Sequence, residues 1–518
     1  MTELALDNYV CGRWVTGEGA ATLVNPATEA PLATAATGGL DLAAAMAFAR
    51  GRGRESVGAL TFRERGEVLR AMSRAVHGRR DELLALAIAN GGNTRADAKF
   101  DVDGAIATLT AYADLGGEIG DRRTLADGDA VQLGRSARLF GRHVHVPRAG
   151  VAVHVNAFNF PAWGLAEKAA CALLAGMPVL AKPATSTALL AHRIVQIWVE
   201  GRVAPEGALS LLCGPAGDLL DHLGGDDVLA FTGSGATAAS VRSRPAFSHA
   251  SAHVNVEADS LNAAVLGPDV AEGSDLGLAF VADVVRDVTQ KAGQKCTAIR
   301  RVYVPSSVLE GFVERLADRL REVRVGDPAR DDVGMGPLAT AAQLRDVRAG
   351  IAALARAARV VCGGAGAIDG LGVAAGKGYF VAPTLLVAGE GRVGAGQDPE
   401  VFGPVATVTP YDGDASAAAR LINGGGGGLV ASIYSDDKDF VRSVVLGIAP
   451  HHGRICITSS KTASQAIPPG TVMPQLLHGG PGRAGGGEEL GGRRGVLLYM
   501  QRVALQGDRA TIEEIASR

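Results

Sequence analysis

Short apolar runs alternate with helical stretches from Val151 to Leu266. Four of these runs have the length of buried strands, and each precedes a segment with helical spacing: VAVHV, PVLAK, ALSLLC and DVLAFTG. The alternation predicts βαβ units around a parallel sheet that is covered by helices on both faces. A nucleotide-binding sheet is the natural interpretation of this part of the chain.

A second alternating block begins beyond Gly267. It contains the strand-like run RRVYVP and helical stretches around 309–323 and 340–357. Residues 41–90 place apolar side chains at helical spacing, which predicts surface helices packed on a core. A chain of 518 residues can bury two sizeable cores, so we expect two or three domains with the chemistry in the cleft between the α/β blocks.

Two glycine-dense segments, NGGGGG at 423–428 and GGPGRAGGGEELGG at 479–492, predict loops. The first is expected to be a flexible surface loop. The second contains Arg483, Glu488 and Glu489, and a functional lid would have the same composition. The following string GVLLYMQRVALQG predicts a strand, and an extra strand at a C-terminus often pairs with another subunit.

Charge and cysteine content narrow the class of function. The formal net charge is -3 without a block of like charges, which argues against a nucleic-acid or membrane surface and favours a small-molecule partner. The apolar run 169–181 is shorter than the roughly 20 residues of a membrane span, and the N-terminus does not resemble a secretory signal, so the cytoplasm is expected. The six cysteines form no CxxC pairs, which argues against a zinc site and a disulfide framework.

Cys296 lies in one of three strings that carry most of the chemical information: VNAFNFPAWGLAEK, VEADSLN and GQKCTAIR. Taken alone, a cysteine in such a chain is more often a buried, inert thiol. Gly293 would let the backbone pass close to a ligand, and Lys295 would favour the thiolate if its side chain points toward the sulfur. This setting is unusual for a core cysteine and makes Cys296 a candidate nucleophile.

Six motifs, in the same order and at approximately the same spacing, resemble the aldehyde dehydrogenase superfamily across nearly the whole chain. They are Asn159-Phe160-Pro161, Lys182-Pro183-Ala184, Phe231 to Ser234, Glu257, Cys296, and Glu400 to Val405. The resemblance implies that family's α/β fold. It places a Rossmann-like cofactor domain at 1–124 and 149–258, an α/β catalytic domain at 259–470, and a small β oligomerisation element with the late active-site loop at 125–148 and 471–518.

The resemblance also implies a covalent mechanism. Cys296 would add to the aldehyde carbon, and the Asn159 amide with the backbone N–H of Cys296 would hold the oxyanion. Hydride transfer would leave a thioester, which water activated by Glu257 would hydrolyse, so a free carboxylic acid is the expected product. Lys168 and Glu489 match further family positions and are expected to form a proton relay with Glu257, with a surface lysine and a solvated loop acid as the alternatives.

A nicotinamide cofactor follows from the same resemblance. NAD-preferring relatives carry a carboxylate three residues after the motif lysine, where it binds the adenosine ribose. This chain has Lys182, Ala184 and Thr185 within the string KPAT, and the missing carboxylate makes room for a 2′-phosphate. NADP is therefore expected rather than NAD.

Four more residues are expected to bind the cofactor. Gly233 and Ser234 would open a helix toward the pyrophosphate, where N-terminal amides favour an anion. Glu400 matches the residue that holds the nicotinamide ribose, and Phe402 matches one that packs beside the nicotinamide, although an ordinary core phenylalanine is the alternative. The GxGxxG fingerprint is absent, as in this family's variant of the nucleotide-binding fold.

Several strings are not general features of the family, and they bear on the substrate. EADSLN at 257–262, the late string LHGGPGRAGGGEELGG and NAFNFPAW resemble the dehydrogenase part of the phenylacetate-pathway ring-opening enzyme and the stand-alone dehydrogenase of the CoA-dependent benzoate pathway. The candidates are therefore 3-oxo-5,6-dehydrosuberyl-CoA semialdehyde and 3,4-didehydroadipyl-CoA semialdehyde. The string LLYMQRVALQG favours the phenylacetate branch, whereas no hydratase-type domain follows before Arg518, which keeps the benzoate branch open.

Other functions stay open beside this one. They are a general dehydrogenase of free aldehydes, a CoA-acylating dehydrogenase, against which Glu257 argues, and an inactive homologue that kept the fold. Relatives form dimers or dimers of dimers through a hairpin, expected here around Leu125 to Arg148, and through the C-terminal strand. A homodimer is therefore the expected assembly.

Overall fold

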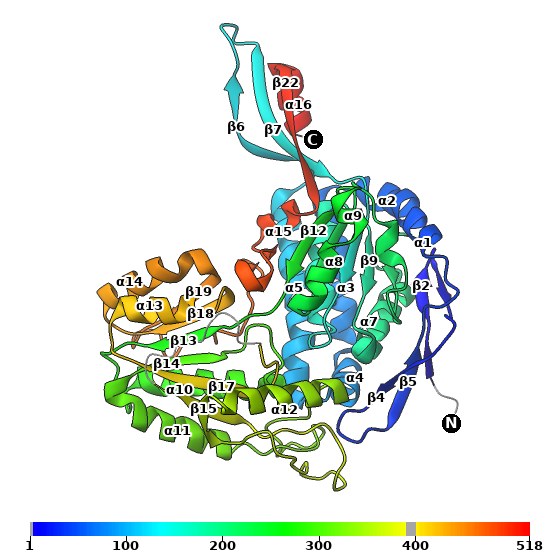
Figure 1. Cartoon of the computed structure of the whole chain (residues 1–518). Helices are drawn as coiled ribbons and strands as arrows, with labels where there is room; N and C mark the ends of the chain where they lie inside the picture. The colour runs from blue at the N-terminus through cyan, green and yellow to red at the C-terminus, as the bar shows by residue number, and fades with distance from the viewer. Residues whose placement is uncertain (1–3, 390–399, 518) are drawn as a thin grey trace.

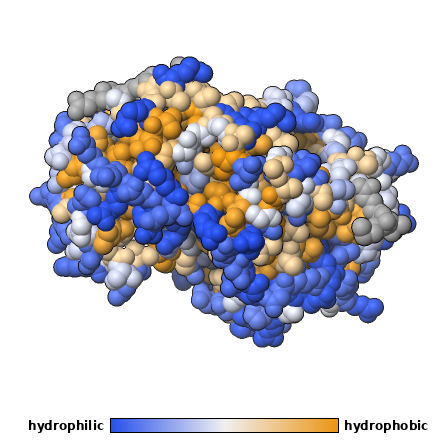
Figure 2. Space-filling model, turned by 90° about the horizontal axis from the view of Figure 1, so that it is seen from below, coloured by the Kyte–Doolittle hydropathy of each residue, from blue (hydrophilic) through white to orange (hydrophobic). Residues whose placement is uncertain are grey.

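The computed structural model describes residues 4–389 and 400–517. Two seven-stranded sheets with helices on their faces form the body, and a three-stranded sheet projects from it (Figure 1). Within the described part of the chain, no helix is long and apolar enough to cross a membrane. The face seen from below carries hydrophobic patches that hydrophilic residues separate (Figure 2). This architecture is the mixed α/β class that the strand and helix pattern predicts.

The first sheet contains the predicted βαβ units. Its strands, in spatial order, are β12 (His253–Glu257), β11 (Val228–Thr232), β8 (Ala152–Val155), β9 (Val179–Lys182), β10 (Leu209–Leu211), β2 (Asn8–Val10) and β3 (Arg13–Val15). The strands β12 to β10 are parallel, and β2 and β3 are antiparallel. Alternate residues of β9 enter different cores, with Val179 and Ala181 on one face and Leu180 on the other. Two-sided burial explains why the strand is apolar up to Lys182, which ends it at the edge of the sheet.

Helices cover both faces of this sheet. On one face lie α3 (Phe62–Gly78), α5 (Arg95–Ile119), α6 (Trp163–Ala175) and α7 (Ala188–Glu200), and on the other lie α1 (Leu42–Phe48) and α8 (Gly235–Arg242). Asp101, on α5, accepts hydrogen bonds from the backbone N–H groups of Ala162 and Trp163 and so caps the start of α6. This cap fixes the helix that carries Lys168 toward the cleft.

The second sheet has the order β15 (Ala358–Cys362), β16 (Thr384–Ala388), β17 (Val405–Tyr411), β14 (Arg301–Pro305), β13 (Ala263–Leu266), β18 (Gly428–Tyr434) and β19 (His452–Thr458). Only β15 runs antiparallel to its neighbour among these strands. Its covering helices are α10 (Asp275–Thr289), α11 (Leu309–Arg321), α12 (Ala341–Ala355), α13 (Ala415–Asn423) and α14 (Lys438–Ile448). The predicted strand at 300–305 and the helices at 309–323 and 340–357 are β14, α11 and α12.

The projecting sheet joins the predicted hairpin to the C-terminal strand. Strands β6 (Leu125–Gln132) and β7 (Leu139–Pro147) form the hairpin, and β22 (Met500–Asp508) pairs antiparallel along the whole of β7. The predicted tail strand is wrong in its first half, because α15 (Arg493–Leu497) precedes β22. Gly495 packs so closely on Leu490 and Cys171 that an added Cβ would lie 2.6 Å from the Leu490 carbonyl, and this tertiary contact overrides the strand pattern.

Both glycine-dense segments are closely packed, which corrects the expectation of a flexible surface loop at 423–428. An added Cβ at Gly427 would lie 2.2 Å from the Pro481 carbonyl, and one at Gly485 or Gly487 would lie 2.4 Å from the Val256 carbonyl. The second segment forms a two-stranded ribbon of β20 (Leu477–Gly479) and β21 (Glu488–Leu490). Glycine is required here because two backbones lie in contact, and the contact holds the ribbon against the end of β12.

Candidate active site

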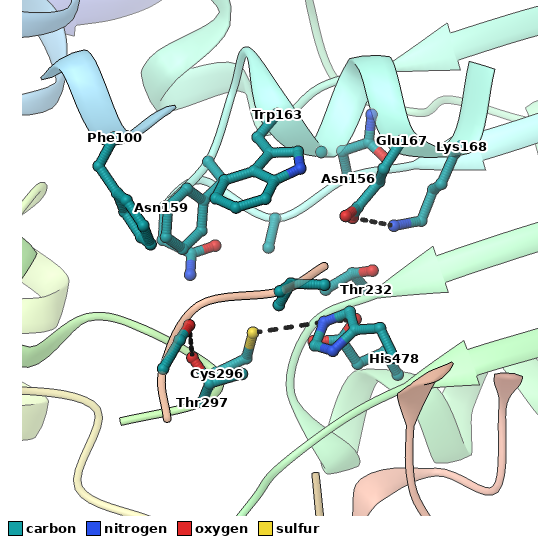
Figure 3. Close-up of a pocket in the computed structure, with 16 residues that line it drawn as sticks. Phe100, Asn156, Asn159, Trp163, Glu167, Lys168, Thr232, Cys296, Thr297 and His478 are labelled. Carbon is teal, nitrogen blue, oxygen red and sulfur yellow. Dashed lines mark hydrogen bonds and ion pairs between the residues drawn. The ribbon is translucent and has the colours of Figure 1, made fainter. Parts of the chain in front are cut away.

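A pocket opens between the two sheets, at the carboxyl ends of strands β8, β11 and β12. Its polar side includes Asn159, Cys296 and His478 (Figure 3), and Glu257 lines it as well. Its apolar side consists of three aromatic rings, Phe100, Phe160 and Trp163, which meet edge to face at centroid distances of 5.3 to 5.9 Å. The cavity measures about 40 Å³, which holds a few water molecules. Small reactants therefore meet a narrow, apolar-walled site with a polar end.

The loop that carries Cys296 follows α10 and has an unusual backbone. Lys291 and Ala292 adopt left-handed φ angles of 54° and 52°, and Gly293 follows at 68°. An added Cβ at Gly293 would lie 2.2 Å from the Gly403 carbonyl, so only glycine fits. The close approach expected at Gly293 is present, but its neighbour is the protein backbone rather than a ligand. Such strain persists only where surrounding structure imposes it.

From the sequence, Lys295 would favour the thiolate if its side chain pointed toward the sulfur of Cys296, but it binds other groups. Its buried ammonium lies 2.6 Å from Asp287 Oδ1 and donates a 2.8 Å hydrogen bond to Gln290. The side chain therefore holds the loop to the end of α10. A second contact fixes Cys296 itself, because the Asn262 amide donates to the carbonyls of Cys296 and Ala298 at 2.7 and 2.9 Å.

The thiol, an imidazole and a carboxylate meet in the pocket. The Nε2 atom of His478 lies 3.8 Å from Cys296 Sγ and 3.2 Å from Glu257 Oε2 (Figure 3). Groups of these kinds also bind metal ions, but two of them already bind each other, and we assign them no ion. The sequence expectation of no metal site stays a prediction.

Burial and charge set the protonation of this cluster. Burial, together with the charge of Glu257, raises the pKa of Cys296 well above its usual range. Burial disfavours the charged form of Glu257 and by itself would raise its pKa. The positive charges of His478 and then Lys168 outweigh burial and lower the pKa of Glu257 to about 2. Burial likewise disfavours a charged His478 and by itself would lower its pKa. The negative charge of Glu257 outweighs burial and raises the pKa of His478. These shifts favour a neutral thiol beside a carboxylate–imidazolium pair.

Asn159 lies on the pocket wall across from Cys296 (Figure 3). Its Nδ2 donates a 3.0 Å hydrogen bond to the Gln294 carbonyl. An amide nitrogen carries two hydrogens, so the second is available to an oxygen inside the pocket. The Gln294 contact orients this donor before any reactant arrives.

Lys168 and Glu489 lie together, and neither is a surface group. The Lys168 ammonium, 2% exposed, lies 2.9 Å from Glu489 Oε2 and 3.3 Å from Glu167 Oε1. Burial opposes the charge of Lys168, but Glu489, Glu167 and Glu257 outweigh it and raise its pKa. Burial raises the pKa of Glu489 to about 7, although Lys168 opposes the shift. Glu489 can therefore exchange a proton near neutral pH.

The candidate cofactor residues of the first sheet follow its carboxyl edge. Lys182 ends β9, and its ammonium lies 3.4 Å from the Thr185 hydroxyl, with Ala184 between them in the chain. The Asn156 amide follows the neighbouring strand β8, and Thr232 Oγ1 ends β11, the next strand along the sheet. Both are buried and have no hydrogen-bond partner among residues 4–389 and 400–517. Polar atoms left free at the carboxyl edge of a parallel sheet fit a bound nucleotide cofactor.

The start of α8 is less open to an anion than the sequence suggested. The Gly233 N–H donates to the Glu257 carbonyl at 3.2 Å. The Gly235 N–H donates to the Asp259 carboxylate at 2.9 Å, and the Ser234 hydroxyl accepts from Thr237 N–H at 3.3 Å. Protein acceptors thus take several of the amides that were expected to face the pyrophosphate.

Glu400 and Phe402 lie on the side of the second sheet. The Glu400 carboxylate accepts hydrogen bonds from Ser260 N–H at 2.9 Å and from Arg300 Nε at 3.3 Å. Burial raises the pKa of Glu400 to about 7, although Arg300 opposes the shift. The Phe402 ring packs edge to face on Phe158 at 5.8 Å, and the Arg300 guanidinium lies 5.4 Å from its centre. These contacts fit a carboxylate and a ring placed at the border of a cofactor site.

Two functional candidates were missed from the sequence. His478 stands in the late string LHGGPGRAGGGEELGG, which was used only as a mark of resemblance. Glu167 lines the pocket four residues after Trp163, which also lines it, and this helical spacing is a signal that could have been used.

A family model described as the aldehyde dehydrogenase family matches residues 14–502. The chain is 44% identical over 480 residues to 3,4-dehydroadipyl-CoA semialdehyde dehydrogenase of Aromatoleum evansii, which covers 92% of this chain and 93% of that protein. These matches confirm the resemblance that the six motifs indicated.

Solved structures with the same fold agree. Lactaldehyde dehydrogenase from Escherichia coli superposes with a TM-score of 0.83 at 26% identity, covering 98% of this chain and 99% of that one. Betaine aldehyde dehydrogenase from Staphylococcus aureus, solved in complex with NAD+, gives a TM-score of 0.83 at 22% identity and covers 98% of each chain.

Proposed function

Because this chain belongs to the aldehyde dehydrogenase family, we propose that it oxidises a CoA-linked semialdehyde to the carboxylic acid with NADP as the cofactor. The observation that carries the proposal is that Cys296, Asn159 and Glu257, which the sequence places far apart, line one narrow pocket. A nucleophile, an oxyanion donor and a general base are the groups that this oxidation requires.

The first half of the reaction is addition of Cys296 to the aldehyde carbon. The second amide hydrogen of Asn159 faces the developing oxyanion, because the first is held by Gln294. The cofactor, when bound, supplies the hydride acceptor. Lys182 and Thr185 would hold it at the carboxyl edge of the first sheet, and Glu400 would hold it from the side of the second sheet.

The second half is hydrolysis of the thioester on Cys296. Glu257 Oε1 is buried without a hydrogen-bond partner among the described residues, so it can accept a proton from water inside the pocket. The proton then leaves through the ion pair of Lys168 and Glu489. This pair is near enough to Glu257 for the charge of Lys168 to lower the pKa of Glu257. A base in this position favours a free acid as the product over a new CoA thioester.

The substrate class rests on the relative at 44% identity, whose name specifies a 3,4-dehydroadipyl-CoA semialdehyde. That relative supports the benzoate-type candidate over the phenylacetate-type one, 3-oxo-5,6-dehydrosuberyl-CoA semialdehyde. The aromatic wall of Phe100, Phe160 and Trp163 suits an unsaturated carbon chain behind the aldehyde. A general dehydrogenase of free aldehydes is the second candidate, because the chemistry at Cys296 does not require CoA.

The preference for NADP rests on Thr185. With a hydroxyl instead of a carboxylate beside Lys182, the adenosine ribose site carries no negative charge that would repel a 2′-phosphate.

A homodimer completes the proposal. Val131, Leu139 and Val503 on the projecting sheet are 59%, 40% and 38% exposed, and such apolar side chains are usually covered in an assembly. Sedimentation that shows a stable monomer would overturn this part.

The test of the proposal is cofactor reduction followed by absorbance, with a CoA-linked semialdehyde beside the matching free aldehyde, for the wild type and Cys296→Ala. We expect NADP reduction with the CoA-linked substrate and none in the variant. Equal rates with free aldehydes would favour a general dehydrogenase of free aldehydes over one specific for CoA-linked substrates. Activity that survives Cys296→Ala would overturn the mechanism.

A further inference from the structure

His478 touches both the nucleophile and the base. Its Nε2 lies between Cys296 Sγ and Glu257 Oε2, and one ligating atom from each of the three residues lies within 4.8 Å of the other two. The imidazole is 5% exposed, and strand β20 holds it in place by pairing His478 with Glu489 on β21. A polar ring buried at this position requires a partner for any charge it carries.

The thiol faces an electrostatic difficulty. Cys296 must lose its proton to attack, but a thiolate beside the Glu257 carboxylate would put two anions into a buried pocket, where repulsion is strong. The carboxylates of Glu167 and Glu489 also act on this region, and Lys168 is already paired with Glu489. Among the groups named here, His478 is the one that can bring a positive charge into direct contact with the sulfur.

We propose that His478 is a catalytic residue whose imidazolium binds the Glu257 carboxylate at rest and binds the Cys296 thiolate once the thiol proton has moved to Glu257. In this step the S–H bond of Cys296 breaks and an O–H bond forms on Glu257 Oε1, which has no other hydrogen-bond partner among the described residues. His478 keeps both ring protons and only changes the acceptor of its Nε2–H. The net charge of the three groups is zero before and after the transfer.

The positive charge of His478 keeps Glu257 ionised and therefore able to accept a proton. Without His478, the charge left to oppose the effect of burial on Glu257 would be that of the Lys168 ammonium, which is already paired with Glu489, so this carboxyl would bind a proton more readily. A protonated Glu257 cannot accept the thiol proton. Removing the charge of His478 therefore removes the acceptor and the partner of the thiolate together. This role deepens the proposed function, since it concerns the same site, but the reactivity of the thiol can be measured without any aldehyde.

The experiment is the rate of Cys296 alkylation by iodoacetamide across the pH range, read by mass spectrometry of the peptide, for the wild type, His478→Gln and His478→Phe. The glutamine keeps an N–H donor without a charge, and the phenylalanine keeps a ring of similar size without a donor. At pH 7 we expect both variants to alkylate at least about 10-fold more slowly, with the pH midpoint moved up by about one unit. At high pH the three rates should converge.

His222→Gln is the matched control, because His222 pairs with Asp218 on the surface. Its alkylation rate should equal that of the wild type. Thermal unfolding identifies a variant that fails to fold, and the other His478 variant then gives the result. Wild-type midpoints in both folded variants would overturn the inference. A His478-dependent rate in a protein that oxidises no aldehyde would leave the inference standing and overturn the proposed function instead.

Discussion

The Lys168 ammonium lies 2.9 Å from Glu489 Oε2, and both side chains are buried. Since burial raises the pKa of Glu489 to about 7, this carboxyl can hold a proton at neutral pH and pass it on. The pair is thus suited to restoring Glu257 between the two halves of the reaction.

Glu489→Gln should slow turnover by at least about 10-fold, because loss of a proton-transfer group typically costs on the order of 10²–10⁴ in rate. A rapid first round of cofactor reduction should persist, since acylation precedes the step that the relay serves. Stopped-flow absorbance separates the two phases. Glu488→Gln is the matched control, because Glu488 is the exposed neighbour on β21 and should behave like the wild type. An equal loss of the first round would assign Glu489 to another step.

Asn159→Ala should lower kcat by on the order of 10²–10³, the usual effect of removing one oxyanion donor. Thermal unfolding measured beside the kinetics should show a small change, because within the described part of the chain the Asn159 side chain makes one hydrogen bond, to the Gln294 carbonyl. A large loss of stability with an unchanged rate per folded molecule would mean that Asn159 supports the loop and not the oxyanion.

Thr185→Glu should raise KM for NADP at least about 10-fold while KM for NAD changes less, because a new carboxylate repels the 2′-phosphate. Steady-state kinetics with both cofactors measure the ratio. Thr185→Val controls for loss of the hydroxyl contact with Lys182, and it should leave the preference for NADP in place. If both variants shift the ratio equally, charge at this position does not decide the preference.

Cofactor affinity should depend on pH through Glu400. A carboxylate is the better acceptor for ribose hydroxyls, and burial raises the pKa of Glu400 to about 7, so binding should tighten as the pH rises through 7 and weaken below it. Fluorescence titration with NADP at pH 6 and pH 8 should give Kd values that differ by about 10-fold or less. In Glu400→Gln the dependence should vanish. A dependence that persists in the variant would belong to another group.

Lys295→Met should destabilise the fold by about 3 kcal/mol, because it leaves the buried carboxylate of Asp287 without its cation. Chemical denaturation measures the free energy of unfolding. Arg442→Met removes an exposed pair with Asp439 and should cost less than about 1 kcal/mol. Equal effects of the two substitutions would mean that the buried pair contributes no more than a surface one.

Local pattern predicted the sheets well, because buried parallel strands such as β9 must be apolar on both faces and the helices between them must cover those faces. It failed where distant segments decide the structure. The string at 495–499 has the composition of a strand, yet the contact of Gly495 with Leu490 and Cys171 makes it part of a helical turn.

The same limit applies to the site. The six motifs predicted Cys296, Asn159 and Glu257, and these three do line one pocket. The sequence left the direction of Lys295 open, because its partner Asp287 lies on the preceding helix and no spacing rule crosses the kink between them. His478 reaches the thiol only because the ribbon folds back against β12, which the sequence does not reveal.

The contact between the ribbon and β12 also limits how this enzyme can evolve. Gly485 and Gly487 touch the Val256 carbonyl one residue before Glu257, the proposed base, so any side chain added there would push against the backbone that carries Glu257. In a library of random substitutions these positions should be intolerant, whereas Gly366, which has no neighbour within 4 Å of an added Cβ and no left-handed φ, offers space for a side chain. Selection for new substrates would therefore have to change residues of the aromatic wall, because the glycine contacts allow few substitutions in the ribbon.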